Sequence, residues 1–238
     1  MRGLGTNRIR VRTQLARMLR TLLLFLASAV MLSAADTSKT ILFFGDSLTA
    51  GYGLEDNSLA FPGLIQKRID EHKLPYRVVN AGLSGETTAG GLRRIDWILR
   101  QPVDIFVLAL GGNDGLRGLQ PAVAQENLQA IIDRVRAKNP QVKIILGGMF
   151  MPPSMGEAYT KAFSEIYPAL AKKNDLGFIP FILESVGGIP EMNQPDLIHP
   201  NARGHAVIAD TVWQVLEPLL GPKQQWQPDA KAPLPTSP

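Results

Sequence analysis

Short apolar runs rich in β-branched residues alternate along this chain with longer amphipathic stretches, and this alternation limits the possible folds more than any other feature. Five such runs predict strands: residues 40–44, 76–80, 104–110, 142–148 and 177–181. Five amphipathic stretches predict helices: residues 58–72, 87–100, 121–138, 157–173 and 202–219. Alternating strands and helices, with strands that are apolar almost throughout, predict an α/β protein whose parallel sheet is covered on both faces.

The helix predicted at residues 121–138 shows the periodicity most clearly. Its apolar residues recur at steps of three and four: Val123, Leu128, Ile131, Ile132 and Val135. One stripe of this helix is therefore expected to face the core. Asn139 and Pro140 then end the helix.

Residues 1–35 predict a cleaved secretory signal peptide. A basic stretch ends at Arg20, an apolar run covers residues 22–32, and small residues at 33–35 place the cleavage after Ala35. The alternative is a retained anchor, but the apolar run is about half the ~20 residues that a membrane-spanning helix needs.

The predicted leader changes how the net charge and the absence of cysteine are interpreted. The whole chain carries a net charge of +4, but residues 36–238 alone carry −2, so no basic face for nucleic acid is expected. Export without any cysteine suits a bacterial periplasm or exterior. Because the basic segment is long, Met18 is an alternative translation start. Residues 221–238 contain five prolines and predict a flexible tail, which leaves residues 36–220 as the folded domain.

Small and polar residues follow each predicted strand. They occupy residues 45–47, 80–87, 111–114, 149–153 and 196–200. Because functional residues of parallel α/β sheets lie beyond the carboxyl ends of the strands, these segments are expected to form one site. Nucleotide binding is not favoured, since no Lys-Ser/Thr pair completes a phosphate loop and residues 51–53 lack the third glycine of a dinucleotide fingerprint.

Ser47 is the candidate nucleophile at this edge. A serine hydroxyl needs a base within hydrogen-bonding distance, and the base needs an orienting acid. His199 lies in a proline-bracketed loop, three residues after Asp196, and this spacing allows the carboxylate to contact the imidazole. His72 lies in a charged stretch and is expected to be solvated, and a packing or surface role is expected for His205.

Acyl transfer also requires donors for the developing oxyanion. The candidates are the backbone N–H groups of Ser47 and Gly85 and the side-chain amide of Asn113. Taken singly, Gly85 and Asn113 are equally well explained as ordinary turn residues.

Four stretches together resemble the four blocks of the GDSL, or SGNH, hydrolase family. They are "GDSLTAGYG" (45–53), "NAGLSGETTAGG" (80–91), "LGGNDGLRGL" (110–119) and "DLIHPNARGH" (196–205). The family's named residues correspond to Ser47, Gly85, Asn113 and His199, and Asp196 matches the acid three residues before the histidine. The resemblance covers about residues 40–219, and the stretches at 111–121 and 163–173 further resemble the bacterial periplasmic thioesterase, lysophospholipase and arylesterase branch.

The resemblance implies a three-layer α/β/α sandwich with a mostly parallel five-stranded sheet. It also implies hydrolysis of carboxylic esters, and of thioesters or lysophospholipids, with no metal or cofactor. The expected partner is a small ester or lipid substrate, with transient contact to membrane lipid, and the protein is expected to be a monomer.

The acyl side of the pocket is assigned to apolar residues after the third and fourth strands: Leu116, Leu119, Met149, Phe150 and Met151. Methionine adapts its shape to an alkyl chain, but these residues are equally well explained as core.

Three other functions use the same edge of the sheet. A metal-dependent phosphoester hydrolase would use Asp46, Asp114, Asp196 and His199, although the several histidines expected of such a site are absent. A carbohydrate O-deacetylase would use the same serine machinery, and a non-enzymatic lipid or glycan binder would need none of it. Asp46 has no assigned chemical step.

Overall fold

The computed structural model describes residues 38–221. The predicted signal peptide at residues 1–35, with its cleavage point and the alternative start at Met18, lies outside the described residues. The predicted tail also lies outside them, apart from Gly221.

A single five-stranded sheet forms the centre of the described residues. Its strands are β1 (Lys39–Gly45), β2 (Tyr76–Gly82), β3 (Ile105–Ala109), β4 (Lys143–Gly147) and β5 (Gly177–Ile179). The order is β2-β1-β3-β4-β5, and every neighbouring pair is parallel. In this register Gly45 lies opposite Gly82 on one side and Ala109 on the other, so three strands end together at the carboxyl edge.

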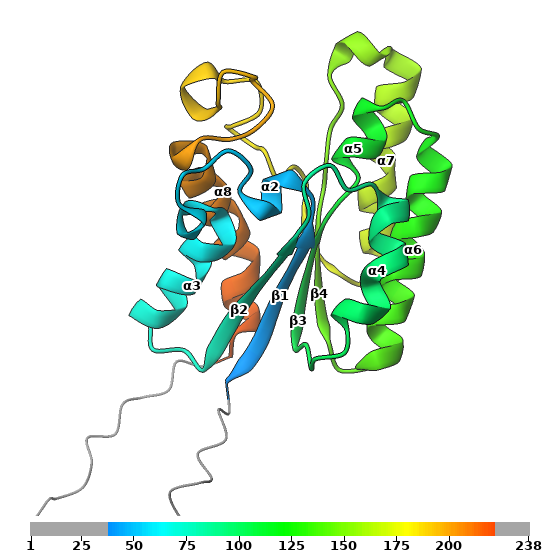
Figure 1. Ribbon diagram of the computed structural model, residues 1–238. Coiled ribbons are helices and arrows are strands. Elements are labelled where there is room, and N and C mark those ends of the chain that lie inside the picture. The colour runs from blue at the N-terminus through cyan, green and yellow to red at the C-terminus, as the bar shows by residue number, and fades with distance from the viewer. Residues whose placement is uncertain (1–37, 222–238) are drawn as a thin grey trace, which may run out of the picture. The chain divides into compact units, whose positions relative to one another are not determined.

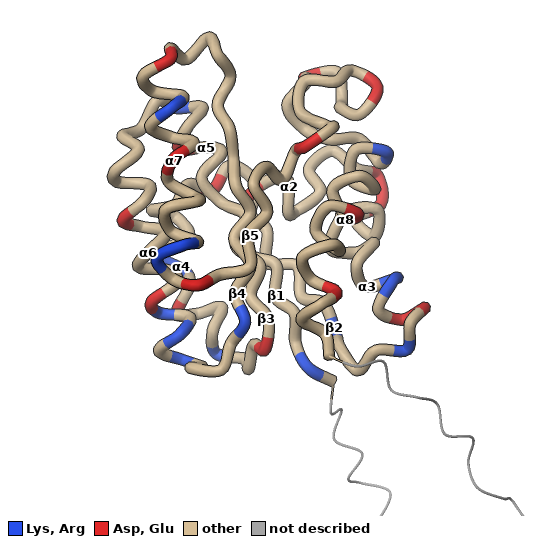
Figure 2. Tube along the Cα trace, turned by 180° about the vertical axis from the view of Figure 1, so that it is seen from behind, with Lys and Arg blue, Asp and Glu red and all other residues tan. Residues whose placement is uncertain are grey.

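Helices cover both faces of the sheet, which confirms the three-layer prediction. The longer helices are α3 (Phe61–Glu71), α4 (Thr88–Ile98), α6 (Pro121–Lys138), α7 (Glu157–Asn174) and α8 (Ala202–Leu216). Figure 1 shows α3 and α8 on one face and α4, α6 and α7 on the other. Lys and Arg positions lie among Asp and Glu positions on α3, α6 and α7 (Figure 2), so the charge on these helices is mixed.

The boundaries differ from the prediction mainly at prolines. The helix expected at residues 58–72 is split into η1 (Asn57–Leu59) and α3, because Ala60 is extended and Pro62 lies in the first turn of α3. Proline also explains why β5 ends before Pro180 and why α8 passes into η4 (Glu217–Leu219) around Pro218.

Four short elements lie in segments for which no helix was predicted. They are α2 (Ser47–Ala50), α5 (Gly112–Leu116), η2 (Pro153–Met155) and η3 (Pro190–Met192). Elements of three to five residues are too short to show helical periodicity, so sequence patterning cannot detect them.

The apolar stripe of α6 faces the core as predicted, with one correction. Leu128, Ile131 and Val135 are buried, whereas Val123 is exposed and its neighbour Ala124 is buried instead. The buried stripe already begins at Ala124 and recurs at steps of three and four, so Val123 lies one position off it. Within residues 38–221, no helix is both long enough and apolar enough to cross a membrane.

Candidate active site

Four segments meet at the carboxyl edge of the sheet. α2 follows β1, the loop at residues 83–87 follows β2, and α5 follows β3 (Figure 1). The loop at residues 193–201, just before α8, reaches the same edge, because His199 in this loop lies within hydrogen-bonding distance of Ser47. Parallel strands end at one edge, which is why segments far apart in sequence converge here.

Glycines allow α2 to sit directly on the strand ends. A Cβ on Gly45 would lie 2.1 Å from Oγ1 of Thr49 and 2.5 Å from the carbonyl oxygen of Ala109. A Cβ on Gly82 would lie 2.3 Å from a backbone nitrogen of α2. Gly45 is the last residue of β1, and its small size admits the helix that begins at Ser47.

Ser47, His199 and Asp196 form one hydrogen-bonded series. The Nε2 atom of His199 lies 3.0 Å from Oγ of Ser47, and its Nδ1 atom lies 2.7 Å from Oδ2 of Asp196. An ionised carboxylate only accepts hydrogen bonds, so Nδ1 carries the imidazole proton and Nε2 is free to accept the serine hydroxyl. The structure thus brings together the three residues that the sequence predicted.

The loop around Asp196 keeps its carboxylate ionised. The backbone N–H of His199, the imidazole of His199 and the backbone N–H of Ile198 all donate to it and lower the pKa of Asp196 to about 2. Leu197 lies in the chain between Asp196 and the two residues whose backbone N–H groups donate to it. It adopts a positive φ of 58°, a conformation uncommon for a bulky side chain. Asp196 is therefore a permanent anion at neutral pH.

Tyr52 and Gln194 support His199, and the sequence analysis did not identify either of them. The Tyr52 ring lies 4.6 Å from the His199 ring, centroid to centroid. The Gln194 side chain donates to the carbonyl oxygens of Tyr52 (2.6 Å) and Pro200 (3.0 Å), while its backbone N–H donates to the carbonyl of His199. Gln194 thereby links the histidine loop to the loop after α2. A lone glutamine in a loop gives no sequence signal for this role.

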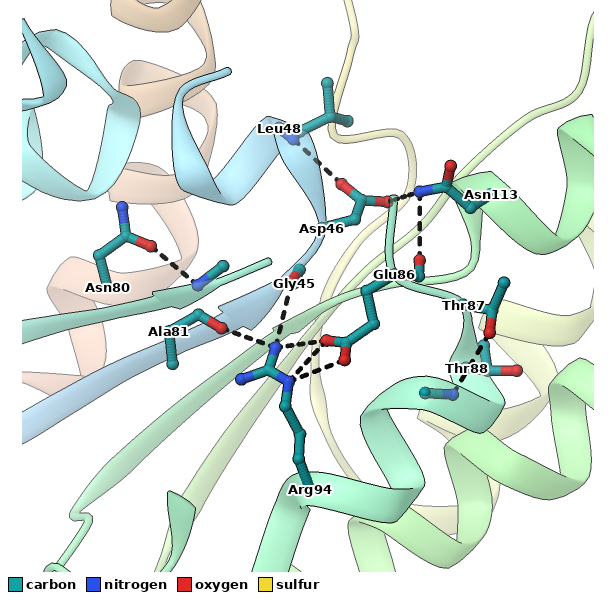
Figure 3. Close-up of polar contacts among 12 residues, drawn as sticks. Gly45, Asp46, Leu48, Asn80, Ala81, Glu86, Thr87, Thr88, Arg94 and Asn113 are labelled. Carbon is teal, nitrogen blue, oxygen red and sulfur yellow. Dashed lines mark hydrogen bonds and ion pairs between the residues drawn. The ribbon is translucent and has the colours of Figure 1, made fainter. Parts of the chain in front are cut away.

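The predicted oxyanion donors lie on three different segments. Ser47 begins α2, so its backbone N–H has no partner within that helix. Gly85 has a positive φ of 77°, which the turn after β2 requires. The side-chain nitrogen of Asn113, on α5, donates to the carbonyl oxygen of Glu86 (3.1 Å) and approaches Oδ2 of Asp46 (3.4 Å), as Figure 3 shows.

Asp46, left without a role by the sequence, is buried at the start of α2. Its Oδ1 atom accepts the backbone N–H of Leu48 at 3.0 Å and so caps the helix. Burial raises the pKa of Asp46 to about 6, against the opposing effects of the Leu48 N–H and the nearby His199. The carboxylate contacts Asn113 and lies beneath the site rather than in the series formed by Ser47, His199 and Asp196.

The carboxylates proposed for a metal site have other partners. Asp114 is buried and accepts the backbone N–H (2.8 Å) and the hydroxyl (2.6 Å) of Thr88. Asp46 caps α2, and Asp196 contacts His199. In the part of the chain that the structure describes, no three His, Cys, Asp or Glu side chains are grouped so that they could hold a metal ion.

The two remaining histidines lie away from this series. His72 is exposed at the end of α3, where Nδ1 lies 2.8 Å from the carbonyl oxygen of Arg68. His205 is buried, which confirms a packing role: its ring stacks on Phe61 and its Nδ1 accepts the backbone N–H of Phe61 at 3.2 Å. Burial lowers the pKa of His205 to about 4.

The five apolar candidates for substrate binding divide into two groups. Leu116, Leu119 and Phe150 are exposed, and Phe150 stacks on Phe181 with centroids 4.7 Å apart. Met149 and Met151 are buried in the core. A Cβ on Gly115 of α5 would lie 2.0 Å from the Met151 sulfur, so this methionine supports the helix that carries Asn113.

A parallel α/β/α sheet that carries a serine, a histidine and a carboxylate in hydrogen-bonded series at its carboxyl edge defines a serine hydrolase. The sequence model of the GDSL-like lipase/acylhydrolase family matches residues 43–207. The chain belongs to this family, and it is an enzyme of the carboxylic ester hydrolase class.

Named relatives align with most of this chain. Esterase TesA of Pseudomonas aeruginosa is 42% identical over 192 residues, which cover 80% of this chain and 94% of TesA. Thioesterase 1/protease 1/lysophospholipase L1 of Escherichia coli K12 is 40% identical over 197 residues, covering 82% of this chain and 92% of that protein. An arylesterase of Vibrio mimicus is 35% identical and covers 84% and 97% of the two chains.

Solved structures show the same fold. A crystal structure of TesA superposes with a TM-score of 0.72 at 43% sequence identity, covering 76% of this chain and 99% of that chain.

Proposed function

We propose that this protein hydrolyses carboxylic esters through an acyl-serine intermediate on Ser47. The observation that supports this most directly is the series from Asp196 through His199 to Ser47, with heavy-atom distances of 2.7 and 3.0 Å. In this series the base has the correct tautomer and the nucleophile lies within reach of it.

The proposed reaction has two halves. The Oγ atom of Ser47 attacks the ester carbonyl while Nε2 of His199 takes the hydroxyl proton, and the charge that develops on the carbonyl oxygen is held by donors from Ser47, Gly85 and Asn113. The intermediate collapses when His199 protonates the leaving alkoxide. Water, deprotonated by His199, then attacks the acyl-serine and restores Ser47, while Asp196 stabilises the imidazolium in both halves.

The substrate range we propose includes aryl and alkyl esters, acyl thioesters and lysophospholipids. The names of the relatives, an arylesterase and a thioesterase/lysophospholipase, support these three classes. The exposed apolar side chains of Leu116 and Leu119, at and just after the end of α5, and of Phe150, just after β4, are proposed to contact the acyl chain. The active species is proposed to be a monomer that makes only transient contact with membrane lipid.

We further propose that the enzyme is exported to the periplasm or the exterior after cleavage behind Ala35. The basic, apolar and small-residue segments of the leader support this assignment. N-terminal sequencing of protein from the periplasmic fraction should begin at Asp36. Recovery of an uncleaved chain in the membrane fraction would contradict export by cleavage.

The decisive test compares the enzyme with Ser47→Ala. Turnover of p-nitrophenyl esters from acetate to palmitate, of acyl-CoA and of lysophosphatidylcholine should fall by on the order of 10⁴ or more, while circular dichroism stays unchanged. A serine-reactive organophosphate should label the parent protein at Ser47 and leave the variant unlabelled. Retained hydrolysis in the variant would exclude the proposed nucleophile, and preferential release of acetate from acetylated xylan would identify a polysaccharide deacetylase instead.

A further inference from the structure

A buried ion pair joins Glu86, in the loop after β2, to Arg94 on α4. The Glu86 side chain is only 4% exposed and that of Arg94 is 20% exposed. The Nε atom of Arg94 lies 2.8 Å from each carboxylate oxygen, and its Nη2 atom contacts Oε2 as well (Figure 3). Such a planar, multiply bonded pair fixes orientation as well as distance.

The same guanidinium also contacts the ends of the two strands nearest the site. Its Nη2 atom donates to the carbonyl oxygen of Ala81 on β2 at 2.8 Å, and it lies 3.5 Å from the carbonyl oxygen of Gly45 at the end of β1. The guanidinium carbon lies 4.2 Å from the centroid of the Phe44 ring on β1. Arg94 therefore holds the loop after β2 against the strand that leads into Ser47.

Glu86 in turn touches the oxyanion donors through its backbone. It directly follows Gly85, and its carbonyl oxygen accepts the amide of Asn113 at 3.1 Å. Its own N–H closes a turn onto the carbonyl of Leu83. The side chain of Glu86 is thus fixed by Arg94, while its main chain is shared with both Gly85 and Asn113.

We propose that Glu86 and Arg94 are positioning residues for the oxyanion hole, and that they set the Gly85 N–H and the Asn113 amide relative to Ser47. This inference rests on the proposed ester hydrolysis. Neither side chain takes part in bond making; they act through the backbone of residues 85 and 86. Because donors of this kind must be held within about 0.5 Å of the productive geometry, loss of the pair weakens transition-state binding more than substrate binding.

The test compares Arg94→Met with Arg93→Met, its exposed neighbour on α4. On a short p-nitrophenyl ester, Arg94→Met should lower kcat by about 10- to 100-fold with KM changed less than about twofold, whereas Arg93→Met should leave both within about twofold. A value of kcat for Arg94→Met within twofold of the parent would overturn the proposal.

A double-mutant cycle with Asn113→Ala separates positioning from general destabilisation. Asn113→Ala alone should lower kcat by about 10² to 10³. If Arg94 acts through this donor, adding Arg94→Met to Asn113→Ala should cost less than about threefold more. A full multiplicative loss in the double variant would show that Arg94 does not set the Asn113 amide, and it would overturn the proposal that the pair positions both donors.

Glu86→Gln is the second test variant, used if Arg94→Met does not fold. It removes the charge of residue 86 and leaves the size of its side chain and its main chain unchanged. It should lower kcat by about 3- to 10-fold at unchanged KM, again with little further effect in the Asn113→Ala background. Unchanged kcat would overturn the proposal. Ser47→Ala, measured alongside, separates failure of the proposed function from failure of the positioning role. If Ser47→Ala stays active, the proposed function fails. If Ser47→Ala is inactive while Glu86→Gln matches the parent, only the positioning role fails.

Discussion

At the scale of single residues, Asp46 is a carboxyl group whose charged form is destabilised by burial. It caps α2 through Leu48 and contacts Asn113, yet it is buried and its pKa is raised to about 6. A carboxyl with a raised pKa in the folded state favours folding at low pH and opposes it at high pH. Proteins retain such groups at functional sites although uncharged substitutes are more stable.

We predict that Asp46→Asn is more stable than the parent at pH 8. Asparagine keeps an oxygen for the Leu48 N–H and removes the buried charge, which is worth about 3 kcal/mol at pH 8. The lost acceptor for the Asn113 amide costs about 1–2 kcal/mol, so the net gain in the free energy of unfolding is about 1–2 kcal/mol. The gain is complete above pH 6 and should disappear as the pH falls from 6 toward 3.8, where the parent carboxyl is protonated in both states. Urea unfolding at pH 8 and pH 4.5 measures both values.

The same variant should lose activity. Its new amide group meets the amide of Asn113, donor against donor, so kcat should fall by about tenfold or more. Asp56→Asn, at an exposed cap whose pKa is lowered by hydrogen bonds from Ser58, is the control and should show no gain at pH 8. An Asp46→Asn variant less stable than the parent at pH 8 would contradict the assignment of a burial penalty.

At the scale of elements, His205 joins α8 to the start of α3. Its Nδ1 accepts the N–H of Phe61, a group that the helix itself cannot satisfy, and its ring stacks on the Phe61 ring. The neutral imidazole is required, because a protonated ring has no acceptor. The packing of two helices on one face of the sheet therefore depends on the protonation of one buried histidine.

We predict that this contact weakens in acid. His205 titrates at about 4 when folded and at about 6.5 when unfolded, so the unfolded state binds the proton first as the pH falls. The stability present above pH 6.5 is lost between pH 6.5 and 4, by up to about 3 kcal/mol.

Denaturant unfolding of His205→Asn, compared with the parent, isolates this contribution from that of other groups. Asparagine can place an oxygen where Nδ1 lies and does not titrate in this range. The fall in unfolding free energy between pH 7 and pH 4.5 should be about 2–3 kcal/mol larger in the parent than in the variant. Equal falls in the two proteins would show that His205 does not govern the acid sensitivity.

At the scale of the whole molecule, the series formed by Ser47, His199 and Asp196 joins a buried segment to a more exposed one. Ser47 is buried and anchored to β1 in the centre of the sheet, whereas His199 and Asp196 lie in a more exposed loop held by Gln194. Loops with few buried contacts open at lower free energy than the core. The loop can therefore leave Ser47 without global unfolding.

We predict that activity is lost in urea before the far-UV circular dichroism signal changes. Gln194→Ala should widen the gap and lower kcat by about tenfold in buffer, since two hydrogen bonds of about 1 kcal/mol each are lost, while the thermal midpoint changes little. Gln141→Ala, at the opposite edge of the sheet, is the matched control. Coincident loss of activity and circular dichroism in all three proteins would argue against a separately opening loop.

Much of this architecture was predictable because local patterns carry it. Apolar runs and helical periodicity located all five strands and the five longer helices, and the prolines at positions 62, 180 and 218 account for the shifted ends. Spacing within one loop also predicted the contact between Asp196 and His199, three residues apart. The two short helices α2 and α5 were missed, since four or five residues show no period.

By itself, the sequence predicted the parallel α/β fold and named Ser47, Asp196 and His199 as candidate catalytic residues, because periodicity and short motifs are properties of residues that are neighbours in the chain. Only the tertiary structure revealed the contacts of Asp46, Gln194 and the Glu86–Arg94 pair. It also showed that a Cβ on Gly45 would clash with Thr49 and Ala109. These contacts depend on which buried polar groups meet across the ends of different strands. A hydrogen bond between such groups has no sequence period, so it becomes visible only when the folded chain brings its partners together.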